Sequence, residues 1–256
     1  MTGVERFRDA VVVVAGAGEG VGESAAAYLA TLGATVAVDA GTSERCTQAC
    51  DAVVREFGRL DAVVVAPSLD APALANDASY VAAAIVDAAE AARAALAQLR
   101  ARGHGRLVLV APGPAFPVPG RLCLSVLDSA LCGLARALGT DRESGPVRVN
   151  AVAPLVDSPL TAPFFDAHPY LHRERFGCDA IAPLVAFLCH ERCESRGEVF
   201  SAGGGRVARV ATVTAVGVLA TDAGIDTIAA DFSQIRSVER SLEPRTVLDE
   251  LLLVEV

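Results

Sequence analysis

Residues 155–177, LVDSPLTAPFFDAHPYLHRERFG, contain the side chains of this chain that are best suited to proton transfer. Asp166, His168 and His172 follow one another closely in this segment. Histidine titrates near neutral pH and a neighbouring carboxylate can orient its ring, so such a set can act as general acid and base without a cofactor. The same residues could ligate a metal ion, but polar loops more often face water, and we expect no metal site.

The glycine-rich turn AGAGEGVG, residues 15–22, is the second candidate site. Gly16, Gly20 and Gly22 allow a sharp turn and the close approach of a phosphate to a helix N-terminus. The same glycines would be needed simply to pack that helix on a sheet. Asp39 ends the next apolar run, near the position where an acidic side chain accepts from an adenosine ribose. We expect a weak or vestigial NAD(H) site at these four residues, with Asp39 directed away from the nucleotide.

Seven cysteines are present, and two pairs, Cys46 with Cys50 and Cys189 with Cys193, have short spacings. Neither pair completes a four-ligand metal pattern. The N-terminus lacks the features of a secretion signal, and no apolar run approaches the roughly 20 residues that span a bilayer. These features predict a cytoplasmic protein with reduced thiols.

The composition limits the possible partners. The 256 residues carry a net charge of −9, and all 22 basic residues are arginines. A negative balance disfavours nucleic acid and anionic membranes as partners. The alanine-rich, lysine-free composition suggests a bacterial chain.

Short valine-rich runs alternate with alanine-rich helical segments. Runs that are apolar on both faces are typical of parallel strands buried between helices. We expect strands at 11–15, 35–39, 62–66, 107–111, 147–152 and 197–201, and helices at 20–32, 43–57, 77–102, 122–139, 179–191 and near 244–254. This alternation predicts a Rossmann-like doubly wound α/β domain over 1–205, with a C-terminal extension over 206–256 that packs on this domain or on a partner subunit.

Several stretches carry a family resemblance: the glycine turn, GRLVLVAP at 105–112, CLSVLDSALCGLARAL at 123–138 and VRVNAVAP at 147–154. They resemble the short-chain dehydrogenase/reductase family, and residues 181–210 resemble the (3R)-hydroxyacyl-CoA dehydrogenase domains of peroxisomal multifunctional enzymes type 2. The resemblance implies hydride transfer between a nicotinamide and an alcohol or ketone carbon. A fold does not by itself establish that activity.

One strand of the family's sheet has no room in this chain. Between its second and fourth strands, the family has a further helix and a third strand. Residues 40–61 are too few for both, because each parallel crossover needs about a dozen residues. The missing third strand would be the sheet edge, so the remaining pairings can survive its loss.

The resemblance implies four reaction residues: a tyrosine acid/base, a lysine that lowers its pKa, a serine on the substrate oxygen and an asparagine that supports a proton relay. The corresponding positions hold Leu124, Asp128, Ala111 and Ala84. An aspartate would raise the pKa of a neighbouring phenol, which is the wrong direction. We therefore predict that the family's catalytic residues are absent; Asp128 itself could be an exposed or hydrogen-bonded helix residue without a role.

Helices 77–102 and 122–139 are apolar on most sides. A helix that packs on one face needs one apolar stripe, so the additional apolar sides predict a second contact. In the family, the equivalent helices form a four-helix interface between subunits. We expect an obligate oligomer in which this chain pairs with an active homologue through these helices.

Three functions stay open at this point. The leading hypothesis is a catalytically inactive subunit of a heteromeric dehydrogenase, for a hydroxyacyl-CoA or a related hydroxy or keto substrate. The second is a cofactor-independent isomerase, cyclase or dehydratase that uses Asp166, His168 and His172. The third is an NAD-dependent oxidoreductase with non-standard catalytic residues.

Overall fold

The computed structural model describes residues 7–18, 20–39, 43–67, 76–141, 145–219 and 224–251. The chain divides into two compact units, Met1–Val210 and Ala211–Val256. This division comes later than the expected boundary after residue 205, because β7 (Arg206–Val210) pairs along its whole length with β6 (Val199–Gly203) of the first unit.

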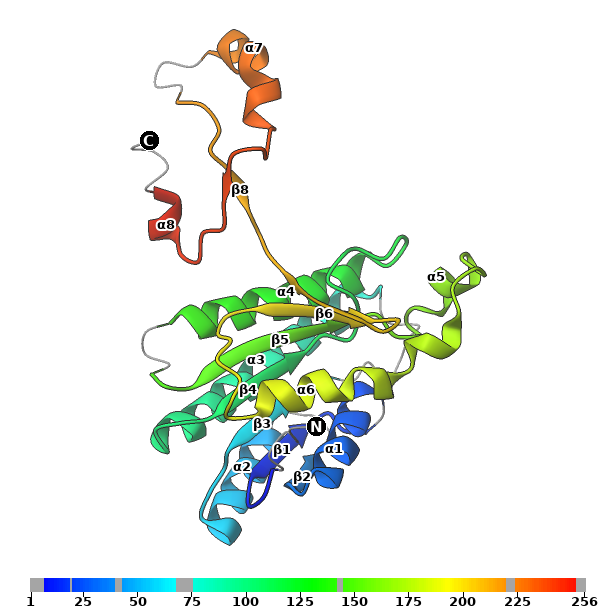
Figure 1. Ribbon diagram of the computed structural model, residues 1–256, viewed down its shortest axis with the longest axis vertical. Coiled ribbons are helices and arrows are strands. Elements are labelled where there is room, and N and C mark those ends of the chain that lie inside the picture. The colour runs from blue at the N-terminus through cyan, green and yellow to red at the C-terminus, as the bar shows by residue number, and fades with distance from the viewer. Residues whose placement is uncertain are drawn as a thin grey trace. The chain divides into compact units, whose positions relative to one another are not determined.

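The first unit contains a seven-stranded sheet in the order β2-β1-β3-β4-β5-β6-β7 (Figure 1). The pairings from β2 to β6 are parallel, and β7 runs antiparallel to β6. The remaining strands are β1 (Val11–Ala15), β2 (Thr35–Asp39), β3 (Ala62–Val65), β4 (Arg106–Val110) and β5 (Arg148–Pro154). The predicted Rossmann-like α/β fold is confirmed.

The prediction of a lost edge strand is also confirmed. β2 is the last strand on its side of the sheet and pairs with β1. In the part of the chain that is described, α2 (Ser43–Phe57) is the one regular element between β2 and β3. The sheet tolerates the loss because the missing strand would pair with β2 alone.

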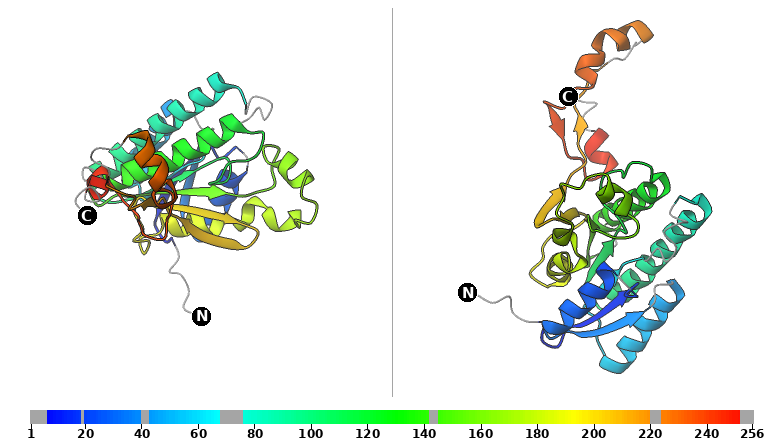
Figure 2. Two further views of the ribbon diagram at one scale, coloured as in Figure 1. Left: turned by 90° about the horizontal axis from the view of Figure 1, so that it is seen from above. Right: turned by 90° about the vertical axis from the view of Figure 1, so that its right-hand side faces the viewer.

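Helices cover both faces of the sheet, as Figures 1 and 2 show. α2, α3 (Ala78–Ala101) and α4 (Leu122–Thr140) pack on one face, and α1 (Val21–Thr31) and α6 (Ala182–Cys189) pack on the other. Val11 and Val13 of β1 point into the first core, whereas Val12 and Val14 point into the second. Successive strand side chains alternate between faces, which explains why these strands are apolar throughout.

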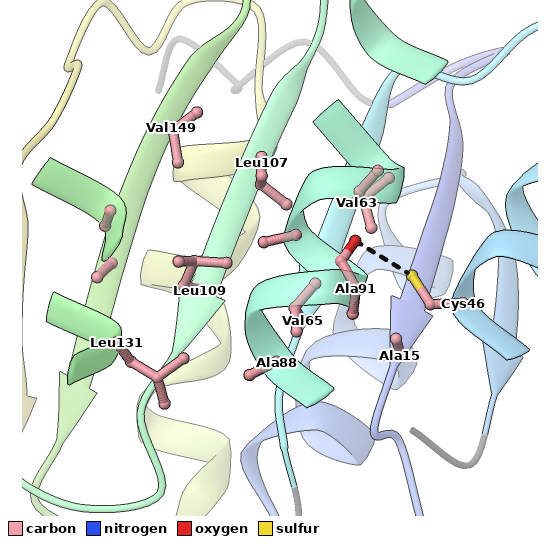
Figure 3. Close-up of a cluster of buried hydrophobic side chains, with 14 of the residues drawn as sticks. Ala15, Cys46, Val63, Val65, Ala88, Ala91, Leu107, Leu109, Leu131 and Val149 are labelled. Atoms are coloured by element: carbon pink, nitrogen blue, oxygen red, sulfur yellow. Dashed lines mark hydrogen bonds between the residues drawn. The ribbon is translucent and has the colours of Figure 1, made fainter. Parts of the chain in front are cut away.

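The core beneath α2, α3 and α4 consists largely of alanine, valine and leucine (Figure 3). Small side chains let α2 and α3 approach closely, and the Cys46 thiol of α2 lies 3.9 Å from the carbonyl oxygen of Ala91 on α3. Cys46 is fully buried there and behaves as a small apolar side chain.

The expectation that no apolar run is long enough to cross a bilayer is wrong for α4. Its 19 residues contain an 18-residue window with a mean hydropathy of 1.5, enough by length and composition to span a membrane. One face of this helix packs on the sheet through Leu124, Leu127 and Leu131, which are all buried. The high hydropathy arises because the opposite face is apolar as well.

Other differences concern the ends and the later elements. The helix expected at 179–191 is confined to Ala182–Cys189, because Cys178–Ala180 forms a separate 3-10 turn and Pro183 favours a helix start. β7 and α5 (Ala162–Asp166) were not predicted. The β7 sequence RVARV has its two arginines three residues apart, which does not fit the two-residue alternation of a strand and gave a weak strand signal.

The second unit contains α7 (Ile225–Ile235), α8 (Val247–Leu251) and a small hairpin of β8 (Thr214–Ala215) and β9 (Ser241–Leu242). α8 corresponds to the helix expected near 244–254, of which residues 252–254 lie outside the described part. No described residue from 211 to 251 is buried. This unit therefore has no apolar core of its own among its described residues.

Candidate functional site

A cavity of about 240 Å³ lies at the carboxyl ends of β3, β4 and β5. Its wall is completed by the N-terminus of α1 and by residues 156–160, which follow β5. Doubly wound sheets bind their ligands at this edge. The cavity is therefore the candidate site that the fold defines, and most of its lining is apolar.

The glycine turn forms one wall of this cavity, and packing alone requires two of its glycines. A Cβ on Gly16 would overlap the carbonyl oxygen of Ala66, and a Cβ on Gly22 would lie 2.6 Å from the carbonyl oxygen of Gly16. Gly20 has a φ of +77°, and a Cβ there would meet no atom within 4 Å. Gly20 and Gly22 line the cavity, so the turn could receive an anion, but its glycines do not by themselves indicate one.

Asp39 lies apart from the cavity lining. Its backbone carbonyl accepts hydrogen bonds from the amides of Gly16 (2.9 Å) and Ala17 (3.2 Å), which fixes the start of the turn. Its carboxylate is close enough to the Cys46 thiol of α2 to act on it electrostatically. The direction of the Asp39 side chain relative to a nucleotide stays a prediction.

Three of the positions predicted to correspond to the family's reaction residues carry apolar side chains. Ala111 lines the cavity and is almost fully buried. Leu124 is fully buried in the core beneath α4, and Ala84 of α3 packs against the same core. These positions contribute packing and no group that can exchange a proton.

Asp128, at the position predicted to correspond to the family's lysine, is buried with 2% exposure, which sequence patterns did not reveal. Its Oδ1 accepts a hydrogen bond from the Gly113 amide at 2.8 Å. Burial raises the pKa of the Asp128 carboxyl to about 7, although the Gly113 hydrogen bond acts in the opposite direction. The contact joins residues that are 15 positions apart, so only the crossing of α4 over the end of β4 creates it.

The lining residues with polar side-chain atoms are Asp157, Ser158 and Cys178. Asp157 forms an ion pair with Arg173 at 3.0 Å, and the Ser158 hydroxyl lies 3.2 Å from the hydroxyl of Thr161. Burial raises the pKa of the Cys178 thiol, which keeps it protonated. None of these groups is poised as a general base.

The structure does not bring Asp166, His168 and His172 together. Asp166 forms an ion pair with Arg173 at 3.1 Å, the His168 Nδ1 lies 2.7 Å from the carbonyl oxygen of Phe164, and His172 lies 3.4 Å from Glu174. None of the three lines the cavity. Among the described residues no group of three or more histidine, cysteine or carboxylate side chains could hold a metal ion.

No protein-family model matches the chain. The chain is 27% identical to peroxisomal multifunctional enzyme A of Dictyostelium discoideum, over 96% of this chain and 64% of that protein. It is 28% identical to the peroxisomal hydratase-dehydrogenase-epimerase of Saccharomyces cerevisiae, over 80% of this chain and 27% of that protein. The structure of full-length peroxisomal multifunctional enzyme type 2 from Drosophila melanogaster matches with a TM-score of 0.72 and 18% identity, covering 98% of this chain and 50% of that one.

These matches relate the chain to the short-chain dehydrogenases/reductases. In particular, the chain resembles the hydroxyacyl-CoA dehydrogenase domain of the multifunctional enzymes. The chain spans less than two thirds of the length of each of these relatives. Their other regions therefore have no counterpart in the matched part.

Proposed function

We propose that this chain is a catalytically inactive, dehydrogenase-like subunit that assembles with an active homologue. The complex would act on a hydroxyacyl-CoA or a related hydroxy or keto compound, in the cytoplasm of a bacterium. The observation that supports the proposal is the set of residues at the predicted reaction positions: Ala111 lines the cavity, and Leu124 and Asp128 are buried and do not line it.

Hydride transfer to a ketone needs a proton donor at the carbonyl oxygen, with a pKa tuned toward the working pH. A nearby cation lowers the pKa of such a donor. This chain has no lysine, and Asp128 would act in the opposite direction. Arginine replaces lysine poorly in this role because it is bulkier and always charged.

The cavity fits one part of a dinucleotide better than the other. The N-terminus of α1, with Gly20 and Gly22 on the cavity wall, suits a phosphate. The nicotinamide ribose would need the cation that Asp128 replaces, and Asp39 is not among the residues that line the cavity. The residues therefore do not fit a catalytically used NAD(H), and a vestigial site is the most that we propose.

The surface proposed for the partner is the outer face of α3 and α4. Val86 of α3 and Leu122 and Val126 of α4 are exposed apolar side chains on helices whose other faces are buried. Exposed apolar patches on a helix pair commonly mark a subunit contact. A homologue with the equivalent helices would complete a four-helix interface and bring its own tyrosine and lysine.

The test is co-expression with a homologue that carries the tyrosine–lysine pair. We expect the two chains to co-purify, and NAD reduction with a hydroxyacyl-CoA to require the homologue. Val86→Asp should prevent co-purification. Val38→Asp, on the edge strand β2, should leave co-purification unchanged. The two valines are equally exposed, Val86 at 62% and Val38 at 61%, so the second variant is a matched control.

Ordinary NAD-dependent alcohol oxidation by the isolated chain would refute catalytic inactivity. Unchanged co-purification of the Val86→Asp variant would refute the proposed surface. The two results are independent, because the first needs no partner and the second needs no substrate.

A further inference from the structure

The cavity at the carboxyl ends of β3, β4 and β5 offers apolar contacts to a ligand and no basic side chain. Its lining consists largely of valine, alanine, proline, glycine and leucine, and Asp157 is the only charged residue in the described part of the lining. An anion in a cavity needs donors, such as guanidinium or ammonium groups, to replace its water. The lining therefore supplies burial for an apolar molecule and no side-chain cation for a phosphate.

Carboxylates gather around the first turn of α1, where the phosphates of a dinucleotide would lie. Asp179 accepts a hydrogen bond from the Ser24 hydroxyl of this turn at 2.7 Å, and Glu23 is in the same turn. Burial raises the pKa of the Cys178 thiol in the cavity lining, and the charges of Asp179 and Glu23 raise it further. Both carboxylates therefore lie close enough to the cavity to act on a group in its wall.

The charge of Asp157 is only partly compensated. Arg173 pairs with it at 3.0 Å, but the same guanidinium pairs with Asp166 at 3.1 Å, so one cation serves two carboxylates. In the described part of the chain, Arg173 is the one basic side chain that bonds to a lining residue. The positive end of α1 amounts to about half an elementary charge. Glu23 and Asp179 together exceed it, so the balance of charge opposes a pyrophosphate.

The hydroxyl of Ser158 is arranged as an acceptor. Thr161 Oγ1 donates to the carbonyl oxygen of Val156, so its hydrogen is already used. The Ser158 hydroxyl, 3.2 Å from Thr161 Oγ1, must then donate to it, and the Ser158 oxygen keeps its own lone pairs. Ser158 and Asp157 thus line the cavity with acceptors. Acceptors suit a hydroxyl or an N–H on a ligand and oppose an oxyanion.

We propose that this cavity does not bind a dinucleotide and instead binds an uncharged, apolar small molecule that carries a hydroxyl or an N–H group. The apolar lining buries the body of this molecule, and Asp157 and Ser158 accept from its polar group. Glu23 and Asp179 exclude anions from the α1 end of the cavity. The proposal rests on the proposed function, because a chain that used NAD(H) would have to bind the phosphates there.

Two dyes with the same ring system separate charge from apolar contact. N-phenyl-1-naphthylamine is uncharged and carries an N–H, and 8-anilino-1-naphthalenesulfonate adds a sulfonate. We expect the uncharged dye to bind the isolated chain at least about tenfold more tightly, as measured by fluorescence titration. Millimolar NAD+ should not displace it, and calorimetry should detect no binding of NAD+. Equal affinities for the two dyes, or displacement by NAD+, would overturn the proposal.

The double variant Glu23→Gln with Asp179→Asn tests the carboxylates themselves. Asparagine can still accept from Ser24, so the contact with α1 is kept. We expect the affinity for the sulfonate dye to rise about fivefold and the affinity for the uncharged dye to stay the same. Glu44→Gln with Glu90→Gln removes two exposed carboxylates from α2 and α3 and should change neither affinity. A Glu23 and Asp179 double variant that binds the sulfonate dye as its parent does would contradict the proposed exclusion.

Alkylation of cysteine locates the bound dye. Cys178 lines the cavity, whereas Cys123 lines a separate groove on the outer side of α4, and both are half-buried. We expect the uncharged dye to slow the reaction of Cys178 with N-ethylmaleimide several-fold and to leave Cys123 unaffected, as measured by mass spectrometry of the peptides. Protection of Cys123 with no protection of Cys178 would place the dye in the groove and overturn the proposal.

These results are distinguishable from a failure of the proposed function. An isolated chain that binds NAD+ without turnover would overturn the ligand proposed for the cavity and leave catalytic inactivity standing. A chain that fails to co-purify with a homologue but binds the uncharged dye beside Cys178 would refute the proposed assembly and leave the ligand proposal standing.

Discussion

The glycine turn and the positions predicted for the reaction residues differ in how they match the family pattern. The turn has the three glycines that the resemblance predicts, Gly16, Gly20 and Gly22. The positions predicted for the reaction residues hold Ala111, which lines the cavity, and Leu124 and Asp128, which are buried outside its lining. The two regions differ in how much the packing of the fold depends on each residue.

Packing explains the difference. Gly16 and Gly22 have no room for a side chain whether or not a ligand binds, so the fold itself requires them. A tyrosine or lysine at the surface of a cavity has no such role, and apolar residues can replace it once chemistry is not required. A retained glycine turn is therefore poor evidence for a retained cofactor in this chain.

The largest effect should come from Gly16→Ala. Its Cβ would overlap the Ala66 carbonyl, and φ is +87°, so steric clash and backbone strain act together. We expect a loss of about 5 kcal/mol in the free energy of unfolding, enough to unfold a domain of ordinary stability. Gly18→Ala, where a Cβ meets nothing within 4 Å, should change stability little. Denaturant titration of both variants checks this, and equal effects would contradict the packing explanation.

The next effect concerns the pH dependence of stability. In the folded state the pKa of Asp128 is raised from 3.8 to about 7. The stabilisation that the protonated carboxyl gives to the folded state is therefore fully present below pH 3.8 and is lost as pH rises through 7. The folded state should lose up to about 4 kcal/mol from this group between about pH 4 and pH 8. Unfolding curves of the parent and of Asp128→Asn at several pH values test this, and the variant should have the flatter profile. Parallel profiles would show that Asp128 titrates at its ordinary pKa.

Restoring the family's tyrosine should be destabilising. Leu124 is fully buried, so Leu124→Tyr adds volume and a hydroxyl to a packed core. We expect a loss of about 2 kcal/mol. Leu122→Tyr, at a position that is 75% exposed on the same helix, serves as the control and should be nearly neutral. A Leu124→Tyr protein as stable as its parent would indicate that a space for the phenol persists.

The smallest effects should come from the histidines of residues 155–177. His168→Ala should cost about 1 kcal/mol, because its ring packs on Phe164 at 4.5 Å and its Nδ1 lies 2.7 Å from the Phe164 carbonyl oxygen. His172→Ala should change stability by less than about 0.5 kcal/mol, because its side chain is 74% exposed. Thermal unfolding of the two variants measures this order, and the reverse order would mean that the segment packs differently.

The periodicity of the sequence predicted the α/β architecture well. Valine runs that were apolar on both faces became β1, β3 and β4, and the predicted helix at 43–57 coincides with α2. These elements are encoded locally, since each needs only its own pattern of apolar residues. The loss of the third strand also followed from local information, because chain length alone excluded a second crossover. β7 was missed because its two arginines, three residues apart, do not give the alternating pattern of a strand.

Residues 155–177 show the limit of local reasoning at the candidate site. Asp166, His168 and His172 are close in sequence, but Arg173, the Phe164 carbonyl and Glu174 hold them in separate interactions. Proximity along a loop does not fix the direction in which side chains point. Their separation became evident only from the folded segment.

The sequence by itself determined the alternation of strands and helices, the shortened sheet edge and the absence of lysine, because each depends on residue type and spacing alone. The tertiary structure decided that Asp128 is buried against Gly113 and that Gly16 and Gly22 are needed for packing. Burial and close approach depend on which distant segments meet, and no local pattern in the chain specifies that meeting.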